Sequence, residues 1–283
     1  MNKSSLALII GITSAFIFSL NAILVQQSAK LLSVSQSTFF RGLITFLCLL
    51  PWSYKNLHQL FNGKSFYLWL RAFSGGIAVI FYLLNTALGS AAEAKALANI
   101  APLFVAIMAY YFYEEKLSKI ELTGLSFLSL GGMLLIFKMS SDSHLWVSGA
   151  VGAFFTGLAY LSLKQASLRF SKSLIVAGFS LGVMMTSLLY GLLSPAEVWI
   201  TPKGKDYFWI LGIGLTGLLG QVSLTYSHLY LKNAVASALT LLTLVFLVFY
   251  ERIFFGIWPS SQVVVSYTGI FAGVILMSIG KKR

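Results

Sequence analysis

Charged residues are scarce in this chain, and acidic ones most of all. Only 10% of the 283 residues are charged, eight of these are acidic, and 58% of the chain is hydrophobic. An average soluble domain is about 25% charged. No water-soluble fold of this size has enough interior to hide so much apolar surface. The composition therefore predicts an integral membrane protein.

Metal-binding and redox-active side chains are also scarce. Cys48 is the single cysteine, which excludes an intramolecular disulfide and a cysteine metal cluster. The three histidines, His58, His144 and His228, lie far apart and have no spacing typical of a zinc site. We expect neither a metal nor a cofactor.

The chain is instead built from long uncharged stretches. Most contain about 20 residues, enough to cross a hydrocarbon core of about 30 Å as a helix. Nine of them are uninterrupted: Ser4–Ala29, Ala72–Ala92, Ala96–Tyr113, Leu122–Phe137, Leu145–Leu163, Ser173–Ala196, Tyr207–Leu231, Asn233–Tyr250 and Ile253–Gly280. A tenth stretch, Ser33–Tyr54, is interrupted only by Arg41. The sequence predicts an all-α integral membrane protein with ten transmembrane helices.

The connections between these stretches are short, so there is no room for a soluble domain. Only Lys55–Ser65 and Pro195–Asp206 resemble real surface loops. The first apolar stretch is longer than the core of a signal peptide, and we expect it to be retained.

The net charge of +12 has a topological explanation. Lysine and arginine collect on the cytoplasmic side of membrane proteins. Alternating the connections from a cytoplasmic N-terminus places thirteen of the 20 lysines and arginines on that side. We expect a multi-pass protein of the cytoplasmic (inner) membrane with both termini in the cytoplasm, and no nucleic-acid partner.

One segment in the first half of the chain resembles one segment in the second half. Ala87–Ile107 can be laid over Leu229–Phe249 without a gap, and this alignment pairs Phe104 with Phe246. Fixed-offset similarity of this kind indicates an internal repeat.

The first span supports the same division. Residues 11–27, GITSAFIFSLNAILVQQ, resemble residues 149–165, GAVGAFFTGLAYLSLKQ. The prediction is two related five-helix repeats, residues 1–140 and 143–283. Five is an odd number, so the second repeat must be inverted relative to the first, as in many secondary transporters.

Glycine pairs have the spacing of helix contacts. Gly178 with Gly182, and Gly269 with Gly273, each put two glycines on one helix face. Helices in lipid associate largely through close packing at small residues. We expect these pairs to serve packing rather than ligand binding.

Several short motifs occur in a familiar order. They are Phe81-Tyr82, Ser90-Ala91-Ala92, Ala101-Pro102-Leu103-Phe104, Glu115-Lys116-Leu117-Ser118, and Gly124 followed by Gly131-Gly132. With ten spans in two halves, the chain resembles the EamA-type branch of the drug/metabolite transporter superfamily. The second half departs from this pattern, since Ile257 and Leu244 stand where Glu115 and Pro102 have their counterparts.

The resemblance implies a carrier of small molecules. Members of the superfamily move amino acids, nucleosides, drugs and other metabolites, so the resemblance leaves the substrate open. For Arg41, about eight residues into its span, it implies a structural or gating role. Arg71 and Lys164 lie near the cytoplasmic ends of spans, and we expect them to be interface anchors.

Glu251 and Arg252 are the sharpest candidates for a binding site. An ionisable group inside a span costs about 2.5–3.5 kcal/mol on insertion scales, so it commonly marks a pathway or a paired site. If the span runs from Asn233 to Ile257, Glu251 lies roughly 9 Å past its middle. It would bind a cation or a proton, with Arg252 as its regulator or an anion contact. A structural ion pair, or a position at the interface, remains the alternative.

Lys95 and Asn99 form a second candidate set on one helix face with Pro102. Proline in a span frees a backbone carbonyl, which water or neighbouring helices must satisfy. Lys95 could hold a carboxylate or phosphate, and Asn99 could donate a neutral hydrogen bond. The alternative is a lysine that extends to the outer interface beside Glu93.

Neutral polar side chains in other spans complete the candidate list. Amides and phenols buried in a membrane either connect helices or line a site, and the sequence does not separate these roles. The additional substrate-binding candidates are Asn21, Tyr82, Asn85, Tyr160 and Gln221.

The sequence thus predicts a secondary active transporter that works by alternating access. Its expected substrate is a small polar or amphipathic metabolite, amino-acid-like or similar, with proton coupling through Glu251 as one option. The lipid bilayer is a further expected partner. We expect the protein to be either a monomer or a homodimer. The competing functions are a membrane-embedded lipid-modifying enzyme and a subunit of a larger complex. No His-Asp or His-Glu cluster supports the enzyme.

Overall fold

The computed structural model describes residues 3–88, 94, 97–98, 100–139, 143–256, 258 and 260–280. These residues form helices and short connections, with no strand among them. The helices before residue 140 are α1 (Lys3–Ser28), α2 (Val34–Ser53), the 3₁₀ helix η1 (Tyr54–Phe61), α3 (Phe66–Leu88), α5 (Ala101–Tyr113) and α6 (Lys119–Met139). The later helices are α7 (Ser143–Ser167), α8 (Lys172–Leu193), α9 (Asp206–Tyr230), α10 (Asn233–Leu239), α11 (Leu242–Phe255) and α12 (Ser261–Ile279). The all-α prediction is confirmed for this part of the chain.

Helix ends follow local sequence signals. Ser33 precedes α2 and its side chain accepts a hydrogen bond from the backbone of Gln36. Ser171 caps α8 in the same way. A serine oxygen in this position satisfies a backbone N–H that has no partner within the helix. The first part of the stretch Lys55–Ser65, expected to be a loop, is instead the 3₁₀ helix η1, and residues 62–65 connect η1 to α3.

Eight helical segments of the described chain are long and apolar enough to cross a membrane. They are α1, α2 with η1, α3, α7, α8, α9, α10 with the first part of α11, and α12. α5 is a shorter apolar helix of 13 residues, and α6 has 21 residues. The chain is therefore a multi-pass membrane protein, and its predicted total of ten spans stays a prediction.

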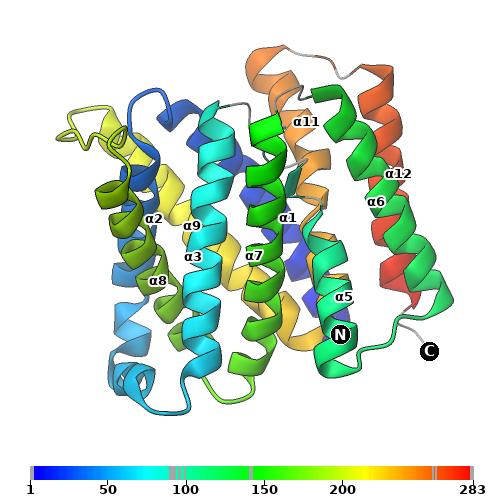
Figure 1. The fold of residues 1–283 in the computed structure, drawn as a ribbon, viewed down its shortest axis with the longest axis horizontal. Coiled ribbons are helices and arrows are strands. Elements are labelled where there is room, and N and C mark those ends of the chain that lie inside the picture. The colour runs from blue at the N-terminus through cyan, green and yellow to red at the C-terminus, as the bar shows by residue number, and fades with distance from the viewer. Residues whose placement is uncertain are drawn as a thin grey trace.

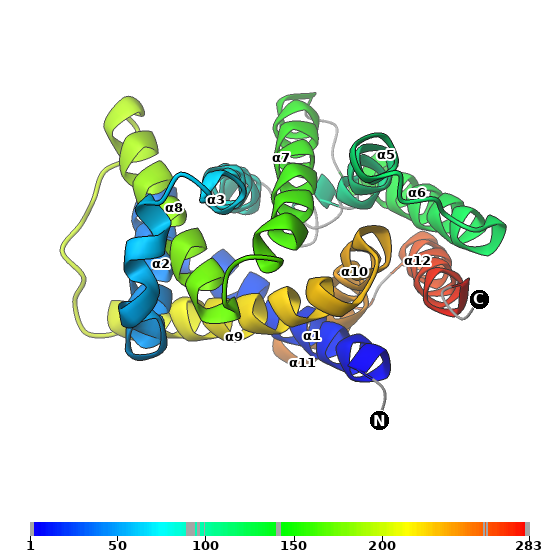
Figure 2. The same ribbon diagram turned by 90° about the horizontal axis from the view of Figure 1, so that it is seen from below.

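The helices pack mainly in pairs that join the two halves of the chain. The most extensive contacts are those of α6 with α12, α3 with α7, α1 with α9, and α2 with α8. Figures 1 and 2 show α6 and α12 side by side at one end of the long axis, with α2 and α8 at the other. Neither half forms a separate bundle.

Glycines let these pairs approach closely. A Cβ built on Gly182 of α8 would lie 2.5 Å from the backbone of Ala72 in α3. A Cβ on Gly273 of α12 would lie 2.7 Å from the carbonyl oxygen of Gly124 in α6. Such distances leave no room for a side chain, which confirms a packing role for these two glycines.

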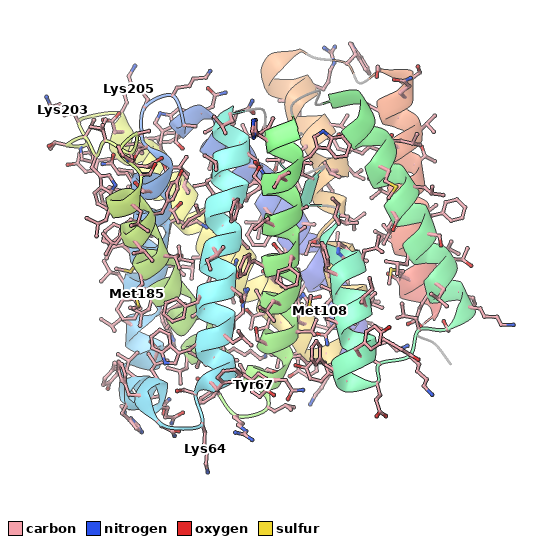
Figure 3. All side chains as sticks on the ribbon, viewed as in Figure 1. Lys64, Tyr67, Met108, Met185, Lys203 and Lys205 are labelled. Carbon is pink, nitrogen blue, oxygen red and sulfur yellow. The ribbon has the colours of Figure 1, made fainter. Side chains whose placement is uncertain are left out.

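Three lysines mark the two opposite ends of the molecule. Lys64 lies at one end, and Lys203 and Lys205 lie at the opposite end (Figure 3). α1 begins and α12 ends at the end that carries Lys64 (Figure 1). This arrangement agrees with the predicted alternation of the connections.

Gly182→Ala tests the close contact between α3 and α8. The added methyl group would force these helices apart, and we expect a loss of about 1–3 kcal/mol in stability. Thermal unfolding of the purified protein in detergent measures it. Gly63→Ala is the matched control, because a Cβ at Gly63 would meet nothing within 4 Å. Equal unfolding temperatures for the two variants would contradict the close packing.

Single cysteines test which end faces the cytoplasm. In a Cys48→Ser background, Lys64→Cys and Lys203→Cys each place one thiol at one end of the molecule. We expect a membrane-impermeant maleimide to label Lys203→Cys in intact cells and Lys64→Cys only in inverted vesicles, because of the distribution of basic residues. Labelling of both from the same side would refute the topology.

Candidate functional site

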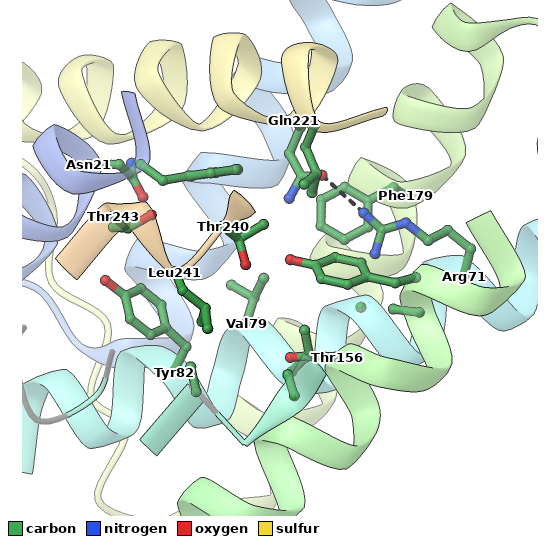
Figure 4. A pocket seen from close by; sticks show the side chains of 18 of the residues that line it. Asn21, Arg71, Val79, Tyr82, Thr156, Phe179, Gln221, Thr240, Leu241 and Thr243 are labelled. Carbon is green, nitrogen blue, oxygen red and sulfur yellow. Dashed lines mark hydrogen bonds between the residues drawn. The ribbon is translucent and has the colours of Figure 1, made fainter. Parts of the chain in front are cut away.

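A cavity of about 110 Å³ lies in the middle of the helix bundle. It is lined by α1, α2, α3, α7, α8 and α9, by the segment that joins α10 to α11 together with the start of α11, and by Ala98 and the start of α5 (Figure 4). Its polar and aromatic lining residues are Phe18, Asn21, Arg41, Arg71, Tyr82, Thr156, Tyr160, Phe179, Gln221, Thr240 and Thr243. The cavity is thus shared by elements from both halves of the chain.

A break in the helix that starts at Asn233 supplies one wall. α10 ends at Leu239 and α11 begins at Leu242. Across the break the backbone N–H groups of Thr240 and Thr243 bond to carbonyls three residues back, at 3.1 and 3.2 Å. This tighter 3₁₀ turn interrupts the helix next to the cavity, where irregular backbone is tolerated in membrane proteins. The span expected to start at Asn233 therefore consists of two helical segments, α10 and α11.

Arg41 enters the cavity from α2 and is 5% exposed. Its Nη1 donates to the side-chain oxygen of Asn21 at 3.0 Å. The amide nitrogen of Asn21 donates in turn to the carbonyl of Ile213 and to the hydroxyl of Thr216. These two bonds fix the amide so that its oxygen faces the guanidinium. Gly217 has no side chain and leaves room for the arginine.

Arg71 enters from α3 and is 3% exposed. Its Nη2 donates to the side-chain oxygen of Gln221 at 3.0 Å (Figure 4). Its guanidinium lies 4.4 Å from the ring centre of Phe179 and 5.9 Å from that of Tyr160. Its Nε has no hydrogen-bond partner among the described residues. Arg71 thus combines a fixed guanidinium with an unused donor.

The carboxylates that the structure describes lie away from this cavity. Glu121 is 2.8 Å from the ammonium of Lys232, and Glu115 is 3.7 Å from that of Lys164. Glu197 accepts a hydrogen bond from the backbone of Ser35. The two arginines consequently have neutral amides as their nearest polar partners, with no acidic group among the described lining residues.

Four of the nine predicted substrate-binding residues line the cavity, namely Asn21, Tyr82, Tyr160 and Gln221. Asn85 is buried elsewhere, where its side-chain oxygen accepts a bond from Ser148 and joins α3 to α7. The four predicted residues that line the cavity come from α1, α3, α7 and α9, which lie far apart in the sequence.

The remaining four predicted residues are not placed in the cavity. Lys95 and Asn99 lie outside the described residues, as does the side chain of Glu251. Arg252 is exposed near the end of α11, where its Nη1 donates to the carbonyl of Gly256 and its guanidinium lies 4.4 Å from the ring centre of Trp258. This position fits the interfacial alternative for Arg252.

The prediction of Arg71 as an interface anchor is wrong. The helix begins at Phe66, five residues before Arg71, so the arginine lies roughly 7.5 Å inside it. The uncharged stretch in this part of the sequence begins only at Ala72, so the charge pattern alone indicates that Arg71 lies at the end of the span. Gly75, one turn later, is the signal that could have indicated a packed guanidinium, since a Cβ there would lie 2.8 Å from Nη1 of Arg71.

The lining of the cavity combines polar and apolar side chains. Two guanidiniums, two amides, two phenols and three threonine hydroxyls surround it together with apolar side chains. No group of three or more metal-binding side chains occurs within the described chain. The polar lining residues offer hydrogen bonds and positive charge to a ligand.

Known proteins resemble the chain over much of its length. Residues 5–138 match the model of the EamA-like transporter family. A protein of Helicobacter pylori named only as a transporter is 28% identical over 229 residues, which cover 77% of this chain and 74% of that protein. The pseudopaline exporter CntI of Pseudomonas aeruginosa is 24% identical over 277 residues, which cover 97% and 96% of the two chains.

A eukaryotic relative and a solved structure extend the comparison. Solute carrier family 35 member G1 of Mus musculus is 25% identical over 275 residues, covering 90% of this chain and 73% of that protein. One solved protein structure superposes with a TM-score of 0.80 over the whole of both chains at 18% identity, which shows a shared fold. Residues 5–138, just under half of the chain, are thus similar to the EamA-like transporter family.

Proposed function

We propose that this protein is a secondary active transporter that carries a small polar or amphipathic metabolite across the cytoplasmic membrane by alternating access. The observation that carries the proposal is the buried polar cavity, which is shared by both halves of a multi-pass membrane protein. Transporter folds typically place their substrate site near the bilayer midplane, between repeats and beside broken helices. The break between α10 and α11 borders the cavity, which supports the proposal.

The proposal includes two inverted repeats, residues 1–140 and 143–283. Aromatic contacts support it. Phe16 meets Phe246 edge to face, with ring centres 5.4 Å apart, and Phe154 meets Phe104 in the same way at 5.7 Å. The alignments of the two halves pair Phe16 with Phe154 and Phe104 with Phe246. One contact therefore recurs with the roles of the halves exchanged.

Backbone contacts between α6 and α12 recur in the same manner. A Cβ on Gly131 would lie 2.7 Å from the carbonyl oxygen of Ser266, and a Cβ on Gly273 would lie 2.7 Å from that of Gly124. The alignment of Phe104 with Phe246 has an offset of 142, and the same offset pairs Gly131 with Gly273 and Gly124 with Ser266. Such reciprocity is expected of a two-fold axis between the halves.

Alternating access follows from this arrangement. Five spans in each half would make the halves antiparallel. Each half could then adopt either of two conformations, and the two halves would exchange these conformations during transport. The cavity would then open to one side of the membrane at a time. Glu115 and Glu121, which bond to Asn233 and Lys232, are proposed to close the end of the molecule near Lys64.

Filling the cavity tests transport through it. Ala78→Phe adds a ring to the lining of the cavity, and we expect metabolite flux to fall by at least about tenfold, since 1.4 kcal/mol of lost binding is tenfold. Proteoliposomes loaded with a mixture of amino acids, organic acids and nucleosides, with efflux followed by mass spectrometry, measure it.

Leu189→Phe provides the control for Ala78→Phe. It adds the same kind of ring at a side chain that is 57% exposed on α8, where lipid would accept it. Flux through Ala78→Phe equal to that through Leu189→Phe would show that the route lies elsewhere. A folded wild-type protein that moves none of these solutes would overturn the transport proposal.

Proton coupling through Glu251 is the finer part of the proposal. A carboxylate within a span is a common proton carrier, and its amide analogue cannot take up a proton. We expect Glu251→Gln to abolish accumulation driven by a pH gradient while leaving exchange down a substrate gradient. Parallel uptake assays with and without the gradient separate these outcomes. Unchanged gradient-driven uptake would eliminate Glu251 as the proton carrier.

A further inference from the structure

The cavity holds two buried guanidiniums and, among the described lining residues, no carboxylate. We infer that it binds a small organic anion, with an oxyanion head that contacts Arg71 and an apolar or aromatic body. The inference rests on the proposed function in one respect, since it names the class of substrate for the same cavity.

The first step concerns charge. Burying an ionised group without an opposite charge is costly, so buried charges are normally paired. The partners of Arg41 and Arg71 are the side-chain oxygens of Asn21 and Gln221, which accept hydrogen bonds but carry no charge. The cavity therefore has an excess of positive charge that an anionic ligand would neutralise.

The second step concerns which carboxylates could have served instead. Glu115 and Glu121 are engaged with lysines and with helix ends, and Glu197 with the backbone of Ser35. Asp206 accepts from the backbone of Lys203 at the start of α9. These carboxylates are held by lysines or by backbone N–H groups away from the cavity lining, which leaves the described cavity for an anion supplied from outside.

The third step concerns geometry. Nη2 of Arg71 is held by Gln221, and the guanidinium lies over the ring of Phe179 (Figure 4). Its Nε is buried and has no partner in the described part of the chain. A guanidinium offers planar, paired donors that match the two oxygens of a carboxylate or phosphate. The unused donor of Arg71 thus points to an oxyanion.

The fourth step concerns the rest of the ligand. The apolar part of the lining consists of side chains such as Phe18, Val79, Phe179, Leu224, Leu241 and Leu244. Apolar surface beside a few polar groups favours a ligand with an apolar or aromatic body. A volume of about 110 Å³ is small compared with the roughly 300–1,000 Å³ of typical ligand pockets, which restricts the ligand to a small molecule.

A series of benzene derivatives tests the charge of the ligand on the unchanged protein. Benzoate, benzamide and benzylamine share one ring and carry negative, neutral and positive head groups, and phenyl phosphate and acetate vary the oxyanion and the body. Binding to the purified protein in nanodiscs is read by calorimetry and by thermal stabilisation. We expect benzoate or phenyl phosphate to bind at least about tenfold more tightly than benzamide and benzylamine, because charge-assisted bonds are stronger by about 1.4 kcal/mol or more.

The relative affinities of benzoate and phenyl phosphate distinguish a carboxylate from a phosphate head. Weaker binding by acetate than by benzoate is expected, because acetate lacks the apolar body. Benzamide or benzylamine binding as tightly as benzoate would overturn the inference, and so would a folded protein that binds none of the anions.

Variants of Arg71 test the contact itself. Arg71→Gln removes the charge, and we expect benzoate affinity to fall about 10- to 100-fold, with partial recovery in Arg71→Lys. The matched control is Arg252→Gln, which removes an exposed arginine at the end of α11. Equal affinities in Arg71→Gln and Arg252→Gln would refute the assigned contact, and the charge series above does not depend on the folding of either variant.

Flux measurements separate the two proposals. Benzoate binding by a folded protein that moves neither benzoate nor any of the metabolites in proteoliposomes would overturn transport and leave the anion site standing. Flux of neutral or cationic solutes without flux of any anion would support transport and overturn the anion site.

Discussion

Two guanidinium groups buried among membrane helices, where little water reaches them, are the constraint on which the rest of the structure depends. Arg41 and Arg71 each require an acceptor, and each finds an amide oxygen on another helix. Each also requires space, which Gly217 and Gly75 provide by having no side chain. The helices must therefore approach closely and in register, and the space at the centre becomes a cavity rather than a packed core.

Much of this architecture could be predicted from the sequence, because membrane insertion is governed by simple rules. The alternation of uncharged stretches and short connections identifies the membrane-crossing helices, since backbone groups in lipid must bond within a helix. The spacing of Gly178 with Gly182, and of Gly269 with Gly273, locates two helix contacts. Asn21, Tyr82, Tyr160 and Gln221 were found as polar groups inside apolar stretches, and these four line the cavity.

The rest depends on tertiary contacts that a hydropathy pattern does not record. An uncharged stretch ends at the first charge, so Arg71 was placed at a helix end although α3 begins five residues earlier. The break between α10 and α11 contains no proline or glycine, and nothing local requires it. Thr240 and Thr243 enter the cavity only because the surrounding helices leave the broken backbone a polar space. Phe179 acquires its role from the guanidinium of Arg71 above its ring.

The proposed repeat and the proposed anion site make different demands on the same scaffold. Extending the first-span alignment, whose offset is 138, pairs Arg41 with Phe179, and extending the offset of 142 pairs Gly75 with Gly217. Arg41 lies against Gly217, and Phe179 lies against Gly75. The packing is thus reciprocal while the chemistry is not. Exchange of conformations between inverted repeats needs only the reciprocal packing. Binding of one anion needs an asymmetric set of charges, so divergence of the lining residues provides a single oriented site without disturbing the helix contacts that would open and close it.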